Sequence, residues 1–250
     1  MRNSAIVLLA TALAARAADY QIQANIRYGL HPETVLDIVQ SRAPALANRP
    51  GVVLFHAGGW VEGAKEDMRE GFCVPLVEHG FVVANVEYRL AKAAPAPAAV
   101  EDALRAAKWF LDHAAEYRVD PARIIAVGES AGGQLALLTG MLPASANLGP
   151  VIKIAAVVDF YGGMPKEMKF FTRRLCPVLI LHGEQDKTVP VEEAYHLQQM
   201  LEKKQIAYEI QIYPGAGHGF SGETWRDASL RTLAFLEKHL ASGQRVKTEA

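Results

Sequence analysis

Residues 124–133 read Ile-Ile-Ala-Val-Gly-Glu-Ser-Ala-Gly-Gly, and this segment is the strongest indication of the fold class. It begins with an apolar run of strand length, and the pattern of residues 131–141 after it is typical of a helix. Between them, residues 128–132 match G-x-S-x-G, in which a serine occupies a sharp turn from strand to helix. Side chains two positions before or after Ser130 would clash in such a turn, so glycine is expected at both. The turn would lift the Ser130 hydroxyl clear of a sheet, beside a helix N-terminus whose dipole favours negative charge.

Apolar runs of strand length alternate with helical patterns along the rest of the chain. The predicted strands are residues 52–56, 82–86, 124–127, 154–158, 178–182 and 206–213, and the predicted helices are residues 66–78, 98–117, 131–141, 191–204 and 224–240. Short, continuous apolar runs are typical of strands covered on both faces of a parallel sheet. Residues 20–28 and 33–40 add an antiparallel hairpin at one edge. The pattern predicts an α/β fold of about eight strands, with helices on both faces.

Length and charge exclude some classes of function. The chain has 250 residues, of which half are hydrophobic, and its formal net charge is -1. This length suits one α/β domain with a substantial core. Because there is no basic excess, we expect no nucleic-acid partner.

The first residues have the layout of a secretory signal peptide. Arg2 is followed by an apolar run over residues 5–15, and Ala15-Arg16-Ala17 places small residues around a cleavage point. The apolar run is too short to span a bilayer; the alternative is an N-terminal helix docked on the domain. We therefore predict a signal at residues 1–17, a single catalytic domain at residues 18–250, and a secreted or periplasmic protein.

The sequence contains two cysteines, Cys73 and Cys176. An exported protein could join them in a disulfide. Cys73 falls in a helical pattern and Cys176 precedes an apolar strand, so two separate core thiols are the expected outcome. Neither spacing resembles a metal site.

A serine hydroxyl needs a base, and the base needs an orienting acid. Among the eight histidines, His218 lies in a glycine-rich loop directly after the last predicted strand. Asp186 follows the preceding strand and comes between Ser130 and His218, the chain order expected when the serine lies in G-x-S-x-G. Asp159, at the end of the neighbouring strand, is the alternative acid. The predicted triad is Ser130, Asp186 and His218.

Backbone N–H groups should stabilise the oxyanion that forms when Ser130 attacks. One donor is expected from Ala131, the residue after the serine. The others are expected from Gly58 and Gly59, in the loop after the first parallel strand, because glycines let the backbone approach a substrate closely. Trp60, the next residue, is a candidate substrate-binding side chain. His56 is expected to have a structural role.

Several of these stretches resemble a known family. His56-Ala57-Gly58-Gly59-Trp60, the run of residues 87–90, the run of residues 128–133 and Gly217-His218-Gly219-Phe220 resemble the hormone-sensitive-lipase-like esterases of the α/β-hydrolase superfamily. Residues 28–29, 36–37 and 59–65 are closer to the bifunctional feruloyl and acetyl-xylan esterases. The resemblance covers nearly all of residues 18–250. It implies the α/β-hydrolase fold and esterase activity without a cofactor or metal.

Two features depart from the family pattern. Ala57 stands where the family has the first glycine of His-Gly-Gly-Gly, and it would strain the loop if that position needs positive φ. The connection between Gly162 and Pro177 is also short, which leaves little material for a cap over the site.

The predicted function is hydrolysis of carboxylic esters, with preference for short acyl groups. By analogy with the family, the ester could be an acetyl or feruloyl group on a polysaccharide. The alternatives are a serine peptidase or lipase of the same fold, or an inactive binding protein on the same scaffold. A peptidase would usually need an extra gating domain, a lipase would need an apolar lid, and an inactive protein would have no need for the complete triad.

Overall fold

The computed structural model describes residues 19–43, 48–165 and 176–241. Within these ranges the strands form a single eight-stranded sheet in the order β1-β2-β4-β3-β5-β6-β7-β8. The strands are β1 (Tyr20–Arg27), β2 (Val35–Ser41), β3 (Arg49–Phe55), β4 (Val82–Val86), β5 (Val119–Glu129), β6 (Val157–Phe160), β7 (Val178–Gly183) and β8 (Tyr208–Tyr213). The predicted signal at residues 1–17 lies outside the described residues.

Strand direction follows the prediction. β1 pairs antiparallel with β2, and β2 pairs antiparallel with β4. The six strands β3 to β8 are all parallel to one another. The sheet is therefore mostly parallel, with the predicted N-terminal hairpin at one edge. Because the strands β3 to β8 all run the same way, their carboxyl ends meet at one edge, where sites of α/β proteins lie.

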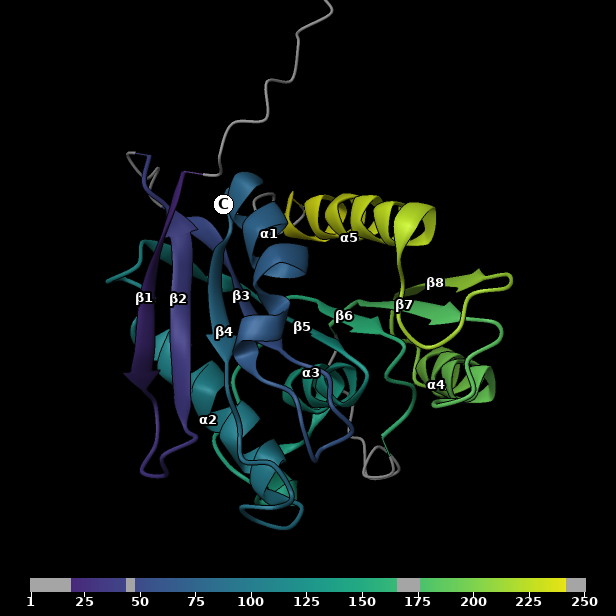
Figure 1. Cartoon of the computed structure of the whole chain (residues 1–250), viewed down its shortest axis with the longest axis horizontal. Helices are drawn as coiled ribbons and strands as arrows, with labels where there is room; N and C mark the ends of the chain where they lie inside the picture. Colours follow the sequence, from purple (N-terminus) through teal and green to yellow (C-terminus); the bar gives the residue numbers. More distant parts are fainter. Residues whose placement is uncertain (1–18, 44–47, 166–175, 242–250) are drawn as a thin grey trace, which may run out of the picture.

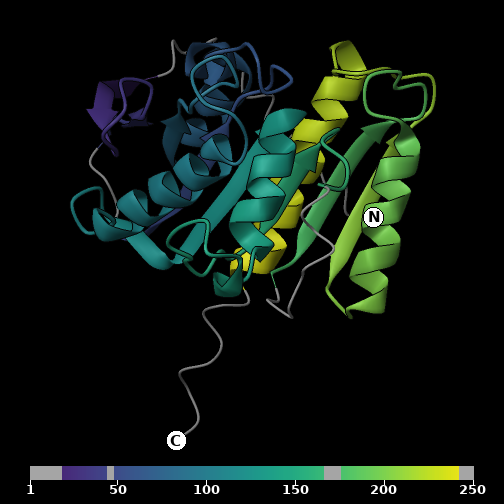
Figure 2. The same ribbon diagram turned by 90° about the horizontal axis from the view of Figure 1, so that it is seen from below.

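Helices cover both faces of the sheet (Figure 1). α1 (Val74–Glu78) and α5 (Gly222–Ala241) lie on one face, and α2 (Ala98–Asp112), α3 (Ala131–Met141) and α4 (Val191–Lys203) lie on the other. Figure 2, turned by 90°, shows α2, α3 and α4 side by side across the second face. None of the helices in the described ranges is long and apolar enough to cross a membrane.

Two buried clusters fill the space between the sheet and these helices. Alternate residues of β3 contribute to opposite clusters: Val53 and Phe55 pack toward α2 and α3, whereas Val52 and Leu54 pack toward α1 and α5. This is the consequence of side chains alternating between the faces of a strand. Burial on both faces explains why the central strands read as continuous apolar runs.

The cysteines lie in different clusters. Cys73 belongs to the cluster under α1 and α5, and Cys176 to the cluster under α2, α3 and α4. Both are buried and no disulfide joins them. The sheet separates the two side chains, so the expectation of two core thiols is confirmed.

Two predicted helices differ from the structure. Residues 66–78 form a 3-10 turn η1 (Lys65–Met68), a π-helical turn η2 (Arg69–Cys73) and then α1, rather than one α-helix. Pro75 near the start of α1 has no N–H to donate, which removes an α-helical hydrogen bond there. The helix predicted to reach residue 117 ends at Asp112, and Arg118 takes a left-handed φ of 55° before β5 begins.

Strand bounds also shift. β5 begins at Val119 rather than residue 124, because Val119 pairs with Arg49 before a register shift in the β3–β5 ladder. β6 begins three residues later than predicted and contains Asp159, although residues 155 and 156 still bond to the neighbouring strand.

The predicted small cap lies partly at residues 166–175, outside the described residues, and stays a prediction.

Candidate active site

Ser130 lies on the turn between β5 and α3, with φ 52° and ψ −117°. Positive φ is uncommon for a residue with a side chain. A Cβ atom on Gly128 would come within 2.2 Å of the Gly132 carbonyl oxygen, and a Cβ atom on Gly132 within 2.2 Å of the Phe55 carbonyl oxygen. Both positions therefore require glycine. The second contact also places the N-terminus of α3 directly against the end of β3.

Ser130, His218 and Asp186 come from three separate loops and meet at the carboxyl edge of the sheet. The Nε2 atom of His218 lies 2.9 Å from Ser130 Oγ, and its Nδ1 atom lies 2.7 Å from Asp186 Oδ2. An ionised carboxylate only accepts hydrogen bonds, so Nδ1 carries the proton and donates it to Asp186. Nε2 is then free to accept the serine proton. This is the arrangement of nucleophile, base and orienting acid.

Asp186 is held in place by backbone donors. Its Oδ1 atom accepts hydrogen bonds from the N–H groups of Thr188 (2.8 Å) and Val189 (2.9 Å). His182 lies against the same loop, with Nε2 2.8 Å from the Val189 carbonyl oxygen and 3.4 Å from Asp186 Oδ2. Burial lowers the pKa of His182 and favours the neutral ring. The Asp186 carboxylate thus presents its second oxygen to His218.

Asp159, the alternative acid, has other partners. It is fully buried in β6 and accepts a hydrogen bond from the Gly162 N–H at 3.0 Å. Burial raises the pKa of Asp159 to about 8. Its Oδ1 atom is so close to α3 that a Cβ atom on Gly133 would lie 2.2 Å from it. Asp159 supports the loop after β6, and Asp186 alone of the two lies within bonding distance of His218.

The glycine loop after β3 has the backbone geometry that only glycine adopts easily. Gly58 has φ 124° and Gly59 has φ 56°, and a Cβ atom on Gly58 would lie 1.8 Å from the Glu62 carbonyl oxygen. Ala57 is not among the residues with positive φ. Alanine is therefore accommodated at the position where the family has glycine.

The N–H groups of Gly58, Gly59 and Ala131 have no acceptor among the described residues. The contact of Gly132 with Phe55 and His56 brings the start of α3 against this loop. The three predicted oxyanion donors thus lie on neighbouring segments, and none of their N–H groups is used in a hydrogen bond within the described ranges. Trp60, the predicted substrate-binding residue, has φ 70° and lines a cavity next to the loop.

His56 has the structural role expected from the sequence. It is fully buried, and its ring stacks on Tyr88 with centroids 4.2 Å apart. Its Nδ1 atom lies 2.6 Å from the Ala57 carbonyl oxygen, and the Tyr88 hydroxyl donates to the His56 carbonyl oxygen at 2.9 Å. These contacts fix the base of the glycine loop.

Sequence reasoning missed one pair of residues at the site. The Tyr161 hydroxyl donates a hydrogen bond to Glu129, the residue before the serine. The Tyr161 ring also meets the His218 ring edge-on, with centroids 5.1 Å apart. Burial raises the pKa of Glu129, whereas the bond from Tyr161 lowers it. An acidic residue inside G-x-S-x-G was the available signal; its partner, 32 residues away, could not be read from the sequence.

The comparison with protein families assigns the chain. Residues 36–173, more than half of the sequence, match the family model described as BD-FAE. The chain belongs to the BD-FAE family. Residues 164–243 of this BD-FAE member also match the prolyl oligopeptidase family, over the part that contains Asp186 and His218.

Curated relatives of this BD-FAE member include several esterases. It is 25% identical to esterase LipC of Mycobacterium tuberculosis, over 83% of this chain and 62% of LipC. It is 34% identical to carboxylesterase NlhH of the same species, over 42% of this chain and 33% of NlhH. The aligned part thus spans less than two thirds of either relative.

Solved structures show the α/β-hydrolase fold. A truncated carbohydrate esterase from gut microbiota superposes with a TM-score of 0.76 at 21% identity, covering 90% of this chain and 98% of that one. Esterase 2 of Thermogutta terrifontis, phosphorylated by paraoxon, gives a TM-score of 0.73 at 25% identity, covering 88% and 94%. The predicted fold class is confirmed.

The burial of Asp159 predicts a pH-dependent stability. Its pKa of about 8 in the fold lies above the ordinary value of 3.8, so the folded chain keeps a proton that the unfolded chain loses. Between these values stability should fall as pH rises, by up to about 1.4 kcal/mol per pH unit. Asp159→Asn removes this titration and should flatten the slope, measured by urea unfolding from pH 5 to pH 8.

The exposed Asp112 provides the control, because Asp112→Asn should leave the slope as in the unmodified protein. Equal slopes for the unmodified protein and Asp159→Asn would show that Asp159 is ionised in the fold.

Proposed function

We propose that this BD-FAE member is a serine carboxylesterase in which Ser130, His218 and Asp186 act as the catalytic triad. The observation that carries the proposal is the unbroken line of contacts from Ser130 Oγ through the His218 ring to Asp186 Oδ2. The esterase names of its relatives support the same reaction class.

The proposed mechanism follows from this geometry. Ser130 Oγ attacks the ester carbonyl carbon while its proton passes to His218 Nε2. The N–H groups of Gly58, Gly59 and Ala131 stabilise the oxyanion. Collapse of the tetrahedral intermediate expels the alcohol, which takes the proton from His218. Water, activated by the same ring, then releases the acid from the acyl-enzyme. Asp186 orients the ring and stabilises its charged form throughout.

We propose a short acyl group, such as acetyl, as the preferred substrate, with acetyl or feruloyl esters on a polysaccharide as the natural class. The family match and the resemblance to a carbohydrate esterase support this class. A long acyl chain gains about 0.8 kcal/mol per methylene only where it is enclosed by apolar surface. The wall of the cavity beside Trp60 includes the charged residues Arg89 and Glu193, and a long acyl chain would lie against these polar groups without bonding to them.

The acyl preference is tested with p-nitrophenyl esters of two to twelve carbons. The expected kcat/KM peaks between acetyl and butyryl and falls at least about tenfold at octanoyl, equivalent to roughly 1.4 kcal/mol. Ser130→Ala is the blank, with an expected loss of roughly 10⁶-fold in kcat and an unchanged fold.

Other outcomes of this panel point to the alternatives. A maximum at eight carbons or more, or a jump in rate above the solubility limit, would indicate a lipase. Full activity of Ser130→Ala would contradict the assignment of Ser130 as the nucleophile of the triad. Because part of the chain matches the prolyl oligopeptidase family, a prolyl p-nitroanilide belongs in the panel, and its cleavage in preference to esters would indicate a peptidase.

The assignment of the acid is tested by paired amide substitutions. Asp186→Asn should lower kcat on p-nitrophenyl acetate by about 10⁴-fold, because an amide favours the wrong imidazole tautomer. Asp159→Asn, which keeps the acceptor for the Gly162 N–H, should lower it by less than about tenfold. The reverse ranking would assign the orienting role to Asp159.

We also propose that residues 1–17 direct export to the periplasm or the medium. The support is the sequence alone: a basic residue, a short apolar run and small residues at the cleavage point. Expression of the full sequence in a Gram-negative host should yield an exported protein whose intact mass begins at Ala18. A cytoplasmic protein that retains residues 1–17 would contradict the proposal.

A further inference from the structure

A cavity of about 440 Å³ lies next to the proposed active site. Three of its lining residues connect it to segments of the proposed active site. Trp60 follows the glycine loop, Gln134 lies one helical turn after Ser130, and Val189 donates its N–H to Asp186. A volume of this size suits a small-molecule group. A part of the ester that extends beyond the reacting carbonyl could therefore enter it.

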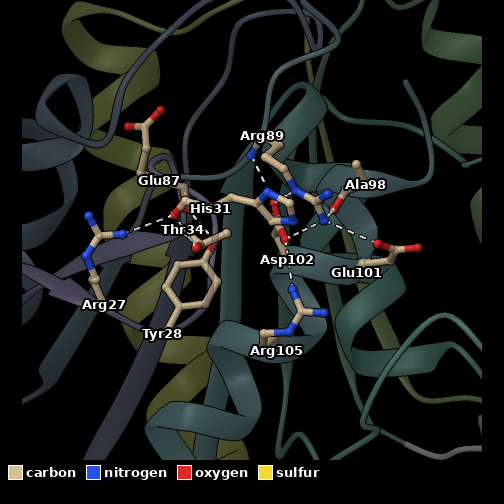
Figure 3. A network of polar contacts seen from close by, with 10 residues as sticks. All are labelled: Arg27, Tyr28, His31, Thr34, Glu87, Arg89, Ala98, Glu101, Asp102 and Arg105. Carbon is tan, nitrogen blue, oxygen red and sulfur yellow. Dashed lines mark hydrogen bonds and ion pairs between the residues drawn. The ribbon is translucent and has the colours of Figure 1, made fainter. Parts of the chain in front are cut away.

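Arg89 supplies a fixed hydrogen-bond donor to this cavity. Its side chain is 10% exposed, and its Nε and Nη2 atoms bond to the two carboxylate oxygens of Asp102 at 2.7 and 2.8 Å. Nη2 also donates to the Ala98 carbonyl oxygen and to Glu101, both at 3.2 Å (Figure 3). The remaining nitrogen, Nη1, has no acceptor among the described residues, and Arg89 lines the cavity. A bidentate pair of this kind holds the guanidinium rigidly.

The charge of Arg89 is already compensated. Asp102 also accepts a bond from Arg105 at 3.2 Å, so Arg89 and Arg105 are balanced by Asp102 and Glu101. Figure 3 shows these four side chains gathered in one network. Arg89 therefore offers a donor without a net positive field. This favours a neutral oxygen as its acceptor over an anion.

Glu193 adds a negative charge to the cavity wall. It lies in the first turn of α4, and its closest ionic partner is His196 at 3.8 Å, which is charged only when protonated. Together with the neighbouring pairs of Arg89 and Arg105 with Asp102 and Glu101, Glu193 gives this group of five side chains a net negative charge at neutral pH. An anionic group entering the cavity would be repelled by Glu193, while the lining cation Arg89 is already paired with Asp102 and Glu101.

We infer that this cavity is a subsite for a neutral, oxygen-bearing part of the ester, with Arg89 Nη1 as donor and Glu193 as the residue that excludes anions. The inference rests on the proposed esterase function. It assigns Arg89 and Glu193 as specificity-determining residues. The apolar wall formed by residues such as Trp60 and Val189 packs against the carbon skeleton of the same group.

Charge selectivity is tested with two acetyl esters, one of methyl glucoside and one of methyl glucuronide, which differ by a carboxylate. The unmodified protein should favour the neutral ester by about tenfold in kcat/KM. Glu193→Gln should reduce this preference to about twofold, whereas Glu192→Gln, outside the cavity, should leave it unchanged.

Recognition of the hydroxyl groups is tested with cyclohexyl acetate, which has a ring but no hydroxyl groups. Its kcat/KM should be about three- to tenfold lower than that of the glucoside ester.

The position of the subsite is tested by filling it. Ala94 lines the cavity and the exposed Ala93 does not. Ala94→Phe should lower kcat/KM on the glucoside ester by at least about tenfold and leave ethyl acetate, which is too small to reach the cavity, within about twofold. Ala93→Phe should leave both substrates unchanged.

A separate binding measurement distinguishes failure of the subsite from failure of the esterase proposal. Saturation-transfer NMR should detect methyl glucoside on Ser130→Ala and lose the signal when Ala94→Phe is added. If no ester is hydrolysed but the sugar binds in this way, the esterase proposal fails and the subsite stands. The subsite is overturned if the sugar signal survives Ala94→Phe, if Ala94→Phe affects ethyl acetate and the glucoside ester equally, or if Glu193→Gln leaves the charge preference intact.

Discussion

The close approach of α3 to the ends of β3 and β5 is the constraint on which the site depends. A Cβ atom at Gly128 or Gly132 would overlap backbone atoms, so the chain can turn from strand to helix here only with glycine at both positions. The same crowding holds Ser130 at a positive φ and places the N-terminus of α3 beside the loop containing Gly58 and Gly59. One steric condition thus presents the serine hydroxyl and gathers the backbone donors around it.

Buried ion pairs hold the loops that surround this turn. Lys65 Nζ lies 3.0 Å from Asp37, and both side chains are almost fully buried, so β2 is joined to the segment that follows the glycine loop. Arg89 and Asp102 join the loop after β4 to α2 in the same way. Replacing one partner of a buried pair costs about 3–5 kcal/mol, because it leaves an uncompensated charge. Such pairs give these loops defined positions relative to the sheet. Arg89 is thereby fixed at the wall of the cavity next to the site.

Three acids near Ser130 have different environments and different roles. Asp186 receives two backbone N–H bonds and the His218 ring, which suits an ionised carboxylate. Asp159 receives backbone bonds from Gly162 and Gly163 in a fully buried position, and burial outweighs these bonds and favours the protonated form. Glu129 is bound by the Tyr161 hydroxyl, whose ring meets His218. The number and kind of donors around each carboxyl group, rather than its distance along the chain from the serine, distinguish the three.

The class of fold, the strand-to-helix turn at Ser130 and the order of Ser130, Asp186 and His218 could be predicted from the amino-acid sequence. These follow from local features: apolar runs of strand length, glycines that the turn requires, and loops directly after strands. The sequence also showed that Ala57 stands where the family has glycine, but not whether the backbone is strained there. Tertiary structure decided what depends on contacts between distant segments: Asp186 rather than Asp159 beside His218, the Glu129–Tyr161 pair, and the cavity with Arg89 and Glu193. A sequence pattern reports the preferences of neighbouring residues, whereas the packing of strands and helices sets which distant side chains share a hydrogen bond or a cavity.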